Sequence, residues 1–241
     1  DATLNTSGHT VGSVAVGGML AMDNYFGDMA TVPSYIYHFV KGGKGNGYNG
    51  GVQTTKDIYY GIIDSGANTN EGNWIKNSDY MDMEEAFLTL QAQSETLRSG
   101  SKTVTPVNGT ITIDLTKETA SIVKYEIAAS DFNSSNVNIK VSDVTWFSEH
   151  ICVISISGTG DITYNGYGVI TFNGESSDTF FTKGLKDYEY NGQACLSGMN
   201  LIWNFPDTEG TVSAVGVGGH LVAPKAHVYI GNGNYEGGII A

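Results

Sequence analysis

Short runs in which apolar and polar residues alternate recur along the chain, and they restrict its fold more than any other feature. In the segment 110–115, Ile111, Ile113 and Leu115 alternate with threonine and aspartate. Such a period of two places the apolar side chains on one face, which is typical of a half-buried β-strand. The same alternation occurs in four further sets: Val123, Tyr125 and Ile127; Val137, Ile139 and Val141; Cys152, Ile154 and Ile156; and Ala226, Val228 and Ile230. The chain is therefore predicted to be mainly β.

Seven Asn-Gly pairs punctuate the chain, among them Asn108-Gly109 and Asn173-Gly174. Both residue types tolerate a positive φ, which tight turns between strands require. These pairs therefore predict sharp turns between the short extended runs.

One segment, about 79–98, is predicted to be a helix. Asn77 or Ser78 can cap its start, acidic residues fill its first turns, and Gly100 follows its last turn. Its apolar residues form one stripe at helical spacing: Tyr80, Met83, Phe87, Leu90 and Leu97. A helix of this length measures about 30 Å, which is the height of about six strands stacked about 4.8 Å apart. We therefore expect this helix to lie along a stack of short strands.

Composition excludes several classes of function. Asp and Glu outnumber Lys and Arg by 25 to 12, which gives a net charge of −13. Nucleic acids bind clustered cations, so a nucleic-acid partner is not expected. The sequence has no run of about 18 apolar residues, so membrane insertion is not expected either. Low charge, two cysteines and many Asn, Thr, Ser and Gly residues are typical of a secreted or surface protein.

Four blocks of residues are specific enough to compare with a known family. The first contains Trp203, Asn204, Phe205, Pro206 and Asp207; the second contains Gly219, Ala223 and Pro224; the third contains Asn232, Gly233 and Asn234; and an N-terminal block contains Gly12, Val14, Gly17 and Gly18. The glycines suit close approaches of backbone, the proline suits a corner or an edge, and the asparagines suit turns. The blocks are therefore expected to serve mainly the fold.

Together these blocks resemble the choice-of-anchor A domain of bacterial cell-surface adhesins. The resemblance implies a right-handed β-solenoid (β-helix) with one long α-helix packed alongside, similar in plan to the ice-binding β-solenoids. It also implies a single domain over residues 1–241 and an extracellular location at the bacterial cell surface. The anchor and further domains of the same surface protein are expected outside this segment.

The sequence predicts no catalytic residues. The five histidines have no zinc-binding spacing, and the nucleophile-elbow pattern of α/β-hydrolases is absent. Carboxylates are numerous, but the sequence places no pair of them together for polysaccharide hydrolysis. No metal site or cofactor is expected; calcium remains an alternative because oxygen ligands are plentiful, although no EF-hand loop occurs. The chain is therefore interpreted as non-enzymatic.

The two cysteines, Cys152 and Cys195, leave two alternatives open. Neighbouring stacked strands lie about 4.8 Å apart, which allows a disulfide if an insertion separates two adjacent strands in the sequence. Otherwise both are free thiols that pack as small hydrophobic residues.

Four tyrosines are candidate ligand contacts: Tyr164, Tyr167, Tyr229 and Tyr235. A tyrosine combines a flat apolar ring with a polar tip, which suits sugars or extended peptides. Tyr164 and Tyr167 flank the Asn165-Gly166 pair, so both are expected to be exposed on a turn. The alternative is that outward tyrosines only stack on one another between neighbouring strands.

The sequence therefore predicts a non-enzymatic adhesive domain that binds a host matrix protein or a glycan. An ice-binding protein is the first alternative, although the pairs Thr103/Thr105 and Thr110/Thr112 do not recur along the chain. A structural spacer or pilus-like subunit is the second alternative, because a stiff stack of strands could simply project other domains.

Overall fold

The computed structural model describes residues 4–6, 14–22, 32–41, 44–45, 48–49, 54–65, 67, 69, 72–165, 168–176, 180, 189–190, 193–194, 200–215, 218–230 and 239–241. The chain divides into two compact units, Asp1–Phe87 and Leu88–Ala241, and each is described by itself. Strands account for 47% of the structure and helices for 16%, which confirms the mainly β prediction. The single domain over the whole chain stays a prediction.

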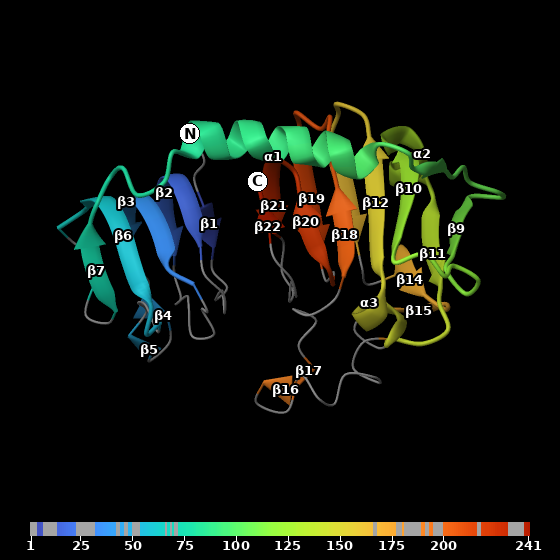
Figure 1. Cartoon of the computed structure of the whole chain (residues 1–241), viewed down its shortest axis with the longest axis horizontal. Coiled ribbons are helices and arrows are strands. Elements are labelled where there is room, and N and C mark those ends of the chain that lie inside the picture. Colours follow the sequence, from blue (N-terminus) through green and yellow to red (C-terminus); the bar gives the residue numbers. More distant parts are fainter. Residues whose placement is uncertain are drawn as a thin grey trace. The chain divides into compact units, whose positions relative to one another are not determined.

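The first unit contains a five-stranded sheet in which every pairing is parallel (Figure 1). Its strands, in spatial order, are β1 (Leu4–Thr6), β2 (Ala15–Met22), β3 (Ser34–Lys41), β6 (Asp57–Ile63) and β7 (Asn73–Lys76). Two shorter strands, β4 (Lys44–Gly45) and β5 (Tyr48–Asn49), pair antiparallel. The apolar core of this unit consists of Val14, Val16, Leu20, Ile36, Phe39 and Ile58.

The second unit contains three larger sheets. The β12 sheet consists, in spatial order, of β22 (Ile239–Ile240), β20 (His220–Val222), β18 (Leu201–Asn204), β12 (Ile151–Ser157), β10 (Ile122–Ala128) and β8 (Lys102–Thr103). The β11 sheet consists of β15 (Glu175–Ser176), β14 (Ile170–Phe172), β11 (Asn136–Lys140) and β9 (Thr110–Asp114). The β19 sheet consists of β13 (Ile162–Asn165), β19 (Thr211–Val215) and β21 (His227–Ile230). The remaining elements are α2 (Ala129–Ser134), α3 (Trp146–Glu149), and the antiparallel pair β16 (Glu189–Tyr190) and β17 (Gln193–Ala194).

Parallel pairing in register builds the core of the second unit. In the β12 sheet, Tyr125 pairs with Ile154, Ile154 with Trp203, and Trp203 with Leu221. Partners in register point to the same side of a sheet, so these residues form one buried row across the strands. The predicted apolar sides of the runs at 111–115, 123–127, 137–141 and 152–156 are buried in the same core, which confirms the alternation argument.

The long helix is α1 (Met83–Arg98), and it begins later than predicted. The carboxylate of Asp82 accepts a hydrogen bond from the Glu85 N–H at 3.0 Å and so caps the first turn. Asn77, one of the predicted caps, instead accepts a hydrogen bond from the Asp79 N–H at 3.1 Å and turns the chain before the helix. The predicted start at residue 79 is therefore wrong, because the sequence offers several capping side chains and the structure uses Asp82, which leaves Tyr80 before the helix.

The predicted turns are confirmed where the structure describes them. Asn108 and Gly109 have φ values of 51° and 73°, and Asn173 and Gly174 have φ values of 53° and 82°. Two consecutive positive φ values favour a sharp strand reversal, and the second pair joins β14 to the antiparallel β15. Gly100, just after α1, has a φ of 77°, which agrees with its predicted place beyond the last helical turn.

A buried asparagine fastens α1 to the β12 sheet, which the C-terminal part of the helix crosses in Figure 1. Ser94 interrupts the predicted apolar stripe of the helix, yet it is 0% exposed. Its hydroxyl donates to Oδ1 of Asn204 at 2.5 Å, and Nδ2 of Asn204 donates to the Ser94 carbonyl oxygen at 2.9 Å. The same Nδ2 donates to Oγ of Ser155 at 3.0 Å, so α1, β18 and β12 share one hydrogen-bond network. Because an unpaired polar group is costly to bury, this network fixes where the helix sits on the sheet.

The rest of the first block also contacts other parts of the fold. Trp203 is buried, and its Nε1 donates to the Gly218 carbonyl oxygen at 3.1 Å. Phe205 and Pro206 are buried next to it. Asp207 forms an ion pair with Arg98, in which Oδ2 and Nη1 lie 2.6 Å apart, and this pair holds the last turn of α1.

The glycines of the other blocks lie where backbone or a side chain comes close. Gly219 has a φ of 105°, and a Cβ added there would lie 2.8 Å from the Leu201 carbonyl oxygen. A Cβ added at Gly17 would lie 3.1 Å from the side chain of Met83. At these two positions a larger residue would push the packed neighbour away.

The remaining residues of the four blocks are either in described parts of the fold or outside the described residues. Val14, Ala223 and Pro224 are buried, and Gly18 lies in β2. Gly12, Asn232, Gly233 and Asn234 lie outside the described residues.

Asn204→Ala is expected to lower the free energy of unfolding by about 3 kcal/mol, because three buried groups lose a hydrogen-bond partner. Urea denaturation at equilibrium measures this change. Asn136→Ala removes the same amide from an exposed position in β11 and is expected to cost less than about 0.5 kcal/mol. An equal loss of unfolding free energy in the two variants would contradict the stabilising role of the hydrogen-bond network.

Gly219→Ala is expected to lower the free energy of unfolding by about 2 kcal/mol, because it combines a left-handed φ with a contact against backbone. The matched control is Gly168→Ala, since a Cβ at Gly168 meets no atom within 4 Å. The melting temperatures of the two variants, measured by circular dichroism, distinguish them. A Gly219→Ala protein that melts with the control would show that the strand pair can shift to make room.

Candidate binding face

The structure describes two of the four tyrosines that the sequence singles out, Tyr164 and Tyr229. Tyr164 is 0% exposed, and its ring centroid lies 4.7 Å from that of Trp203, so the expectation that it is exposed on a turn is wrong. The physical reason is the alternation of β13, which turns Ile162 and Tyr164 into the core and Thr163 outward. Tyr229, in β21, is 58% exposed. Tyr167 and Tyr235 lie outside the described residues.

The exposed tyrosine belongs to the outer side of the β19 sheet. Tyr229 pairs in register with Ser213, and Ser213 pairs with Thr163, so the three side chains lie in one row across the strands. On the opposite side of the same strands, Val212 and Ala214 are buried in the core. We call this outer side the Tyr229 face and define it by these residues: Thr163, Asn165, Thr211, Ser213, Val215, His227 and Tyr229.

The Tyr229 face contains hydroxyl, amide, imidazole and aromatic groups and no Asp, Glu, Lys or Arg side chain. Thr163 and Ser213 were missed at the sequence level. The alternation in 162–165 and 211–215 places both residues on polar sides, but only the register shows that they adjoin Tyr229.

Side chains outside the face fix the edge of its sheet. The amide of Asn133, in α2, donates to the Asp161 carbonyl oxygen at 2.8 Å and accepts from the Thr163 N–H at 3.0 Å. Asp161 in turn accepts a hydrogen bond from the Thr211 N–H at 2.7 Å. These bonds hold β13 and β19 in register independently of any ligand, so the row of side chains is preorganised.

The outer side of the β11 sheet is a second flat polar surface. Thr112 pairs with Asn138, and Asn138 pairs with Thr171, which gives a row of hydroxyl and amide groups. Oγ1 of Thr171 lies 3.2 Å from Oδ1 of Asn138 and hydrogen-bonds to it. The charged pair Lys140 and Asp114 borders the row, and no aromatic residue lies in it.

Shifted carboxylate pKa values in the second unit have local structural causes. Glu118 accepts hydrogen bonds from Lys102 at 2.5 Å and from the Tyr125 hydroxyl at 2.9 Å, which lowers the pKa of Glu118. Burial and the neighbouring Glu118 raise the pKa of Tyr125. Hydrogen bonds from Thr145 lower the pKa of Asp143, as those from Thr116 lower the pKa of Asp114. Each carboxylate accepts hydrogen bonds from nearby groups, and Asp114 lies close enough to Glu118 to offset part of the lowering of the Glu118 pKa.

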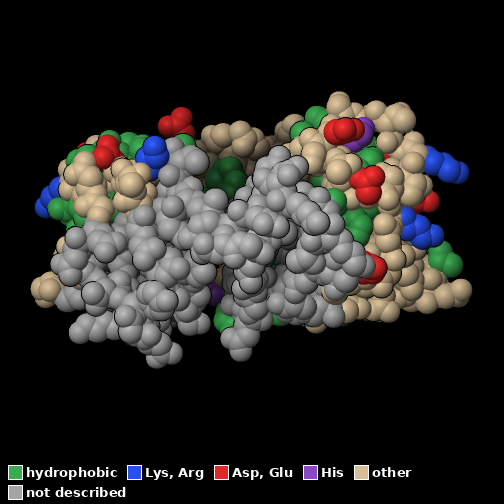
Figure 2. All heavy atoms as spheres, turned by 90° about the horizontal axis from the view of Figure 1, so that it is seen from below, with side chains coloured by type: hydrophobic (Ala, Val, Ile, Leu, Met, Phe, Trp, Pro, Cys, Tyr) green, Lys and Arg blue, Asp and Glu red, His purple; other side chains and the backbone are tan. Residues whose placement is uncertain are grey.

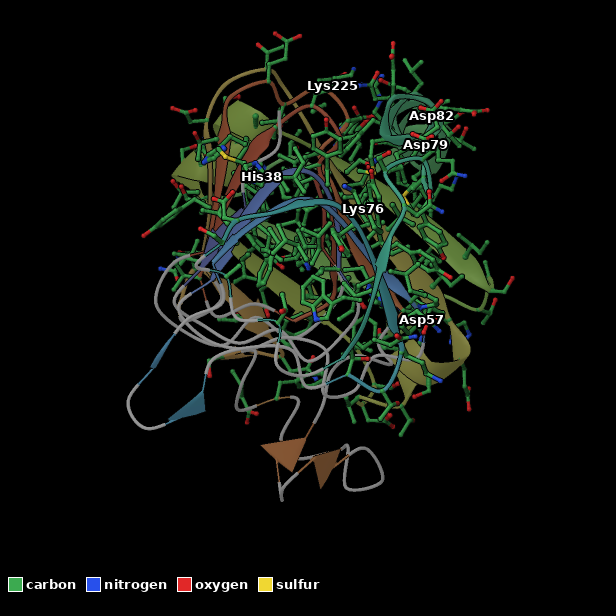
Figure 3. All side chains as sticks on the ribbon, turned by 90° about the vertical axis from the view of Figure 1, so that its left-hand side faces the viewer. His38, Asp57, Lys76, Asp79, Asp82 and Lys225 are labelled. Carbon is green, nitrogen blue, oxygen red and sulfur yellow. The ribbon has the colours of Figure 1, made fainter. Side chains whose placement is uncertain are left out.

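Charged groups are also dispersed elsewhere. In the first unit, Figure 3 shows Asp79 and Asp82 at the start of α1, away from His38 and Asp57. His38 pairs with Asp64 at 2.8 Å. Figure 2 shows charged side chains scattered over the visible described surface of the second unit. Among the residues that the structure describes, no three His, Cys, Asp or Glu side chains gather as metal ligands would.

Cys152 is a free and fully buried thiol in β12, and burial raises its pKa. Cys195 lies outside the described residues. The free thiol of Cys152 agrees with the alternative in which the cysteines do not form a disulfide. None of the described helices is long and apolar enough to cross a bilayer.

A comparison with protein families gives a match over the whole chain. The model of a family described as "Putative Ice-binding-like adhesive domain" matches residues 1–241, which is the whole chain. No curated protein and no solved structure matches the chain. The family match confirms the predicted resemblance at the level of an ice-binding-like adhesive domain, and the family is not a known family of enzymes.

Glu118→Gln is expected to flatten the acid part of the stability profile. The pKa of Glu118 is lower in the folded chain than in the unfolded one, so its carboxylate stabilises the fold above about pH 4.3 and loses this effect as the pH falls through the folded pKa. The melting temperature of the variant should therefore fall less than that of the unchanged protein between about pH 5 and about pH 3. Parallel melting curves for the two proteins would argue against this assignment.

Proposed function

The chain belongs to the family of ice-binding-like adhesive domains, and from that premise we propose that it is a non-enzymatic adhesive domain of a bacterial surface protein. Its partner is a host matrix protein or a glycan. The domain acts outside the cell, while the anchor and further domains belong to other parts of the surface protein.

The observation that carries this proposal is the Tyr229 face. An exposed aromatic ring beside a row of hydroxyl groups, on strands whose outward residues carry no Asp, Glu, Lys or Arg, is suited to binding a polymer. The face rests on buried core residues, so it loses little conformational freedom when a ligand binds. The dispersed carboxylates and the local causes of their pKa shifts support a binding role over a catalytic one.

The proposal includes the fold class. We propose that the chain is a right-handed β-solenoid with α1 packed alongside, and that residues 1–241 are one domain. The pairing order supports this: in the second unit the chain runs from β12 to β13 and β14, then returns to β18 beside β12 and to β19 beside β13. Parallel strands that are reached in this order correspond to successive turns of a coil.

Ice binding is the second candidate function, because the row Thr112, Asn138 and Thr171 repeats hydroxyl and amide groups in register across three strands. The charged residues Asp114 and Lys140 beside this row favour adhesion instead. Thermal hysteresis of the purified protein, and its loss in Thr112→Lys, would select ice binding. A spacer role predicts neither hysteresis nor binding.

Tyr229→Ala is expected to weaken retention on arrays of immobilised matrix proteins and glycans by about tenfold or more, because it removes the exposed aromatic platform of the face. Tyr37→Ala is the matched control, since Tyr37 is 44% exposed in the first unit and lies outside the face. Both proteins should keep the melting temperature of the unchanged chain within a few degrees.

Two results would overturn the proposal. Absence of binding to both arrays at micromolar concentration would remove the adhesive function. If Tyr229→Ala and Tyr37→Ala weaken binding equally, the assignment of binding to the Tyr229 face would be wrong.

A further inference from the structure

We propose that the ligand of the Tyr229 face is a neutral linear polysaccharide, and that its chain lies across the strands along the row Tyr229, Ser213 and Thr163. This inference rests on the proposed adhesive function and specifies the ligand class and its orientation.

The chemistry of the row fits a sugar chain. The ring of Tyr229 offers a flat apolar surface on which the C–H face of a sugar ring can stack, and Tyr229 is 58% exposed. Ser213 and Thr163 place hydroxyl groups beside it, and hydroxyl groups both donate and accept hydrogen bonds, as sugars do. Together they match a ligand that has an apolar face and many hydroxyl groups.

The register gives the orientation. Successive residues of the row belong to neighbouring strands, so their side chains repeat at about 4.8 Å across the sheet. A linear polymer that lies along this direction meets the ring of Tyr229 and then one hydroxyl group on each of the next two strands. A chain lying along one strand would not meet all three groups, because Tyr229, Ser213 and Thr163 belong to three different strands.

Charge selects a neutral polymer. The Tyr229 face has no Lys or Arg to bind carboxylate or sulfate groups, and no Asp or Glu to bind a basic polymer. The net charge of −13 further repels polyanions at moderate ionic strength. The face is less suited to a protein partner. Protein interfaces rely on clustered aromatic and arginine residues, and this face has one tyrosine and no arginine.

Isothermal titration calorimetry with oligosaccharides of increasing length tests the inference. The neutral probes are cello-, xylo-, chito- and galacto-oligosaccharides, and the anionic probes are oligogalacturonate and heparin fragments. We expect at least one neutral series to bind, with an affinity that rises with length and levels off once the row is spanned. The anionic probes should bind more weakly or not at all.

Variants of the row and of its neighbours supply matched controls. Tyr229→Ala should weaken binding about tenfold or more, whereas Tyr229→Phe keeps the ring and should stay within about threefold. Ser213→Ala and Thr163→Val each remove one hydroxyl from the row and should cost about three- to tenfold. Thr211→Val removes a hydroxyl from the neighbouring row of the same face and should weaken binding less than Ser213→Ala does. Circular dichroism spectra confirm that each variant is folded.

The outcomes separate this inference from the proposed function. Binding to a collagen or fibronectin surface that depends on Tyr229, with no response to any neutral oligosaccharide, would overturn the glycan ligand and leave the adhesive function standing. Tighter binding of the anionic probes would overturn the charge argument. An unchanged affinity in Thr163→Val, or a loss in Thr211→Val equal to that in Ser213→Ala, would overturn the orientation.

Discussion

Parallel pairing in register is the constraint on which the second unit depends. It aligns Tyr125, Ile154, Trp203 and Leu221 into a buried row of the β12 sheet, and by the same rule it aligns Thr163, Ser213 and Tyr229 into an outward-facing row of the β19 sheet. A slip of one residue would exchange the two kinds of row, because successive side chains of a strand point to opposite sides. The buried rows therefore hold the exposed row in place, and the composition of the outer surface can vary without disturbing the core.

The helix depends on the same sheet through polar contacts. Asn204 lies in register with Ser155, and both present their side chains to the helix that crosses them. A network of this kind favours one position of the helix, since only one alignment satisfies Ser94, Asn204 and Ser155 together. The apolar contacts of α1 alone would tolerate small shifts along the sheet. The polar residues of the first block thus supply the specificity of packing, and the tryptophan and phenylalanine beside them supply buried apolar area.

The sequence was informative where one local rule decides the structure. Alternation gave the buried sides of the strands, and Asn-Gly pairs gave the turns at Asn108 and Asn173. Prediction from the sequence failed where two local rules give opposite results for the same residue. Tyr164 lies next to an Asn-Gly pair and was expected to be exposed, but the alternation of β13 directs it into the core. Ser94 broke a helical stripe, and only its distant partner Asn204 explains why a polar residue is buried there. The row beside Tyr229 was not predictable, since register between strands far apart in the sequence leaves no local signal.

The side chain of Asn133 has one further consequence. It occupies the outer edge of β13 and takes up a backbone carbonyl and a backbone N–H there, as a neighbouring strand would. An incoming polypeptide therefore finds these two hydrogen-bonding groups already engaged. A single amide at this border therefore leaves fewer unpaired backbone groups for a strand of another molecule to pair with.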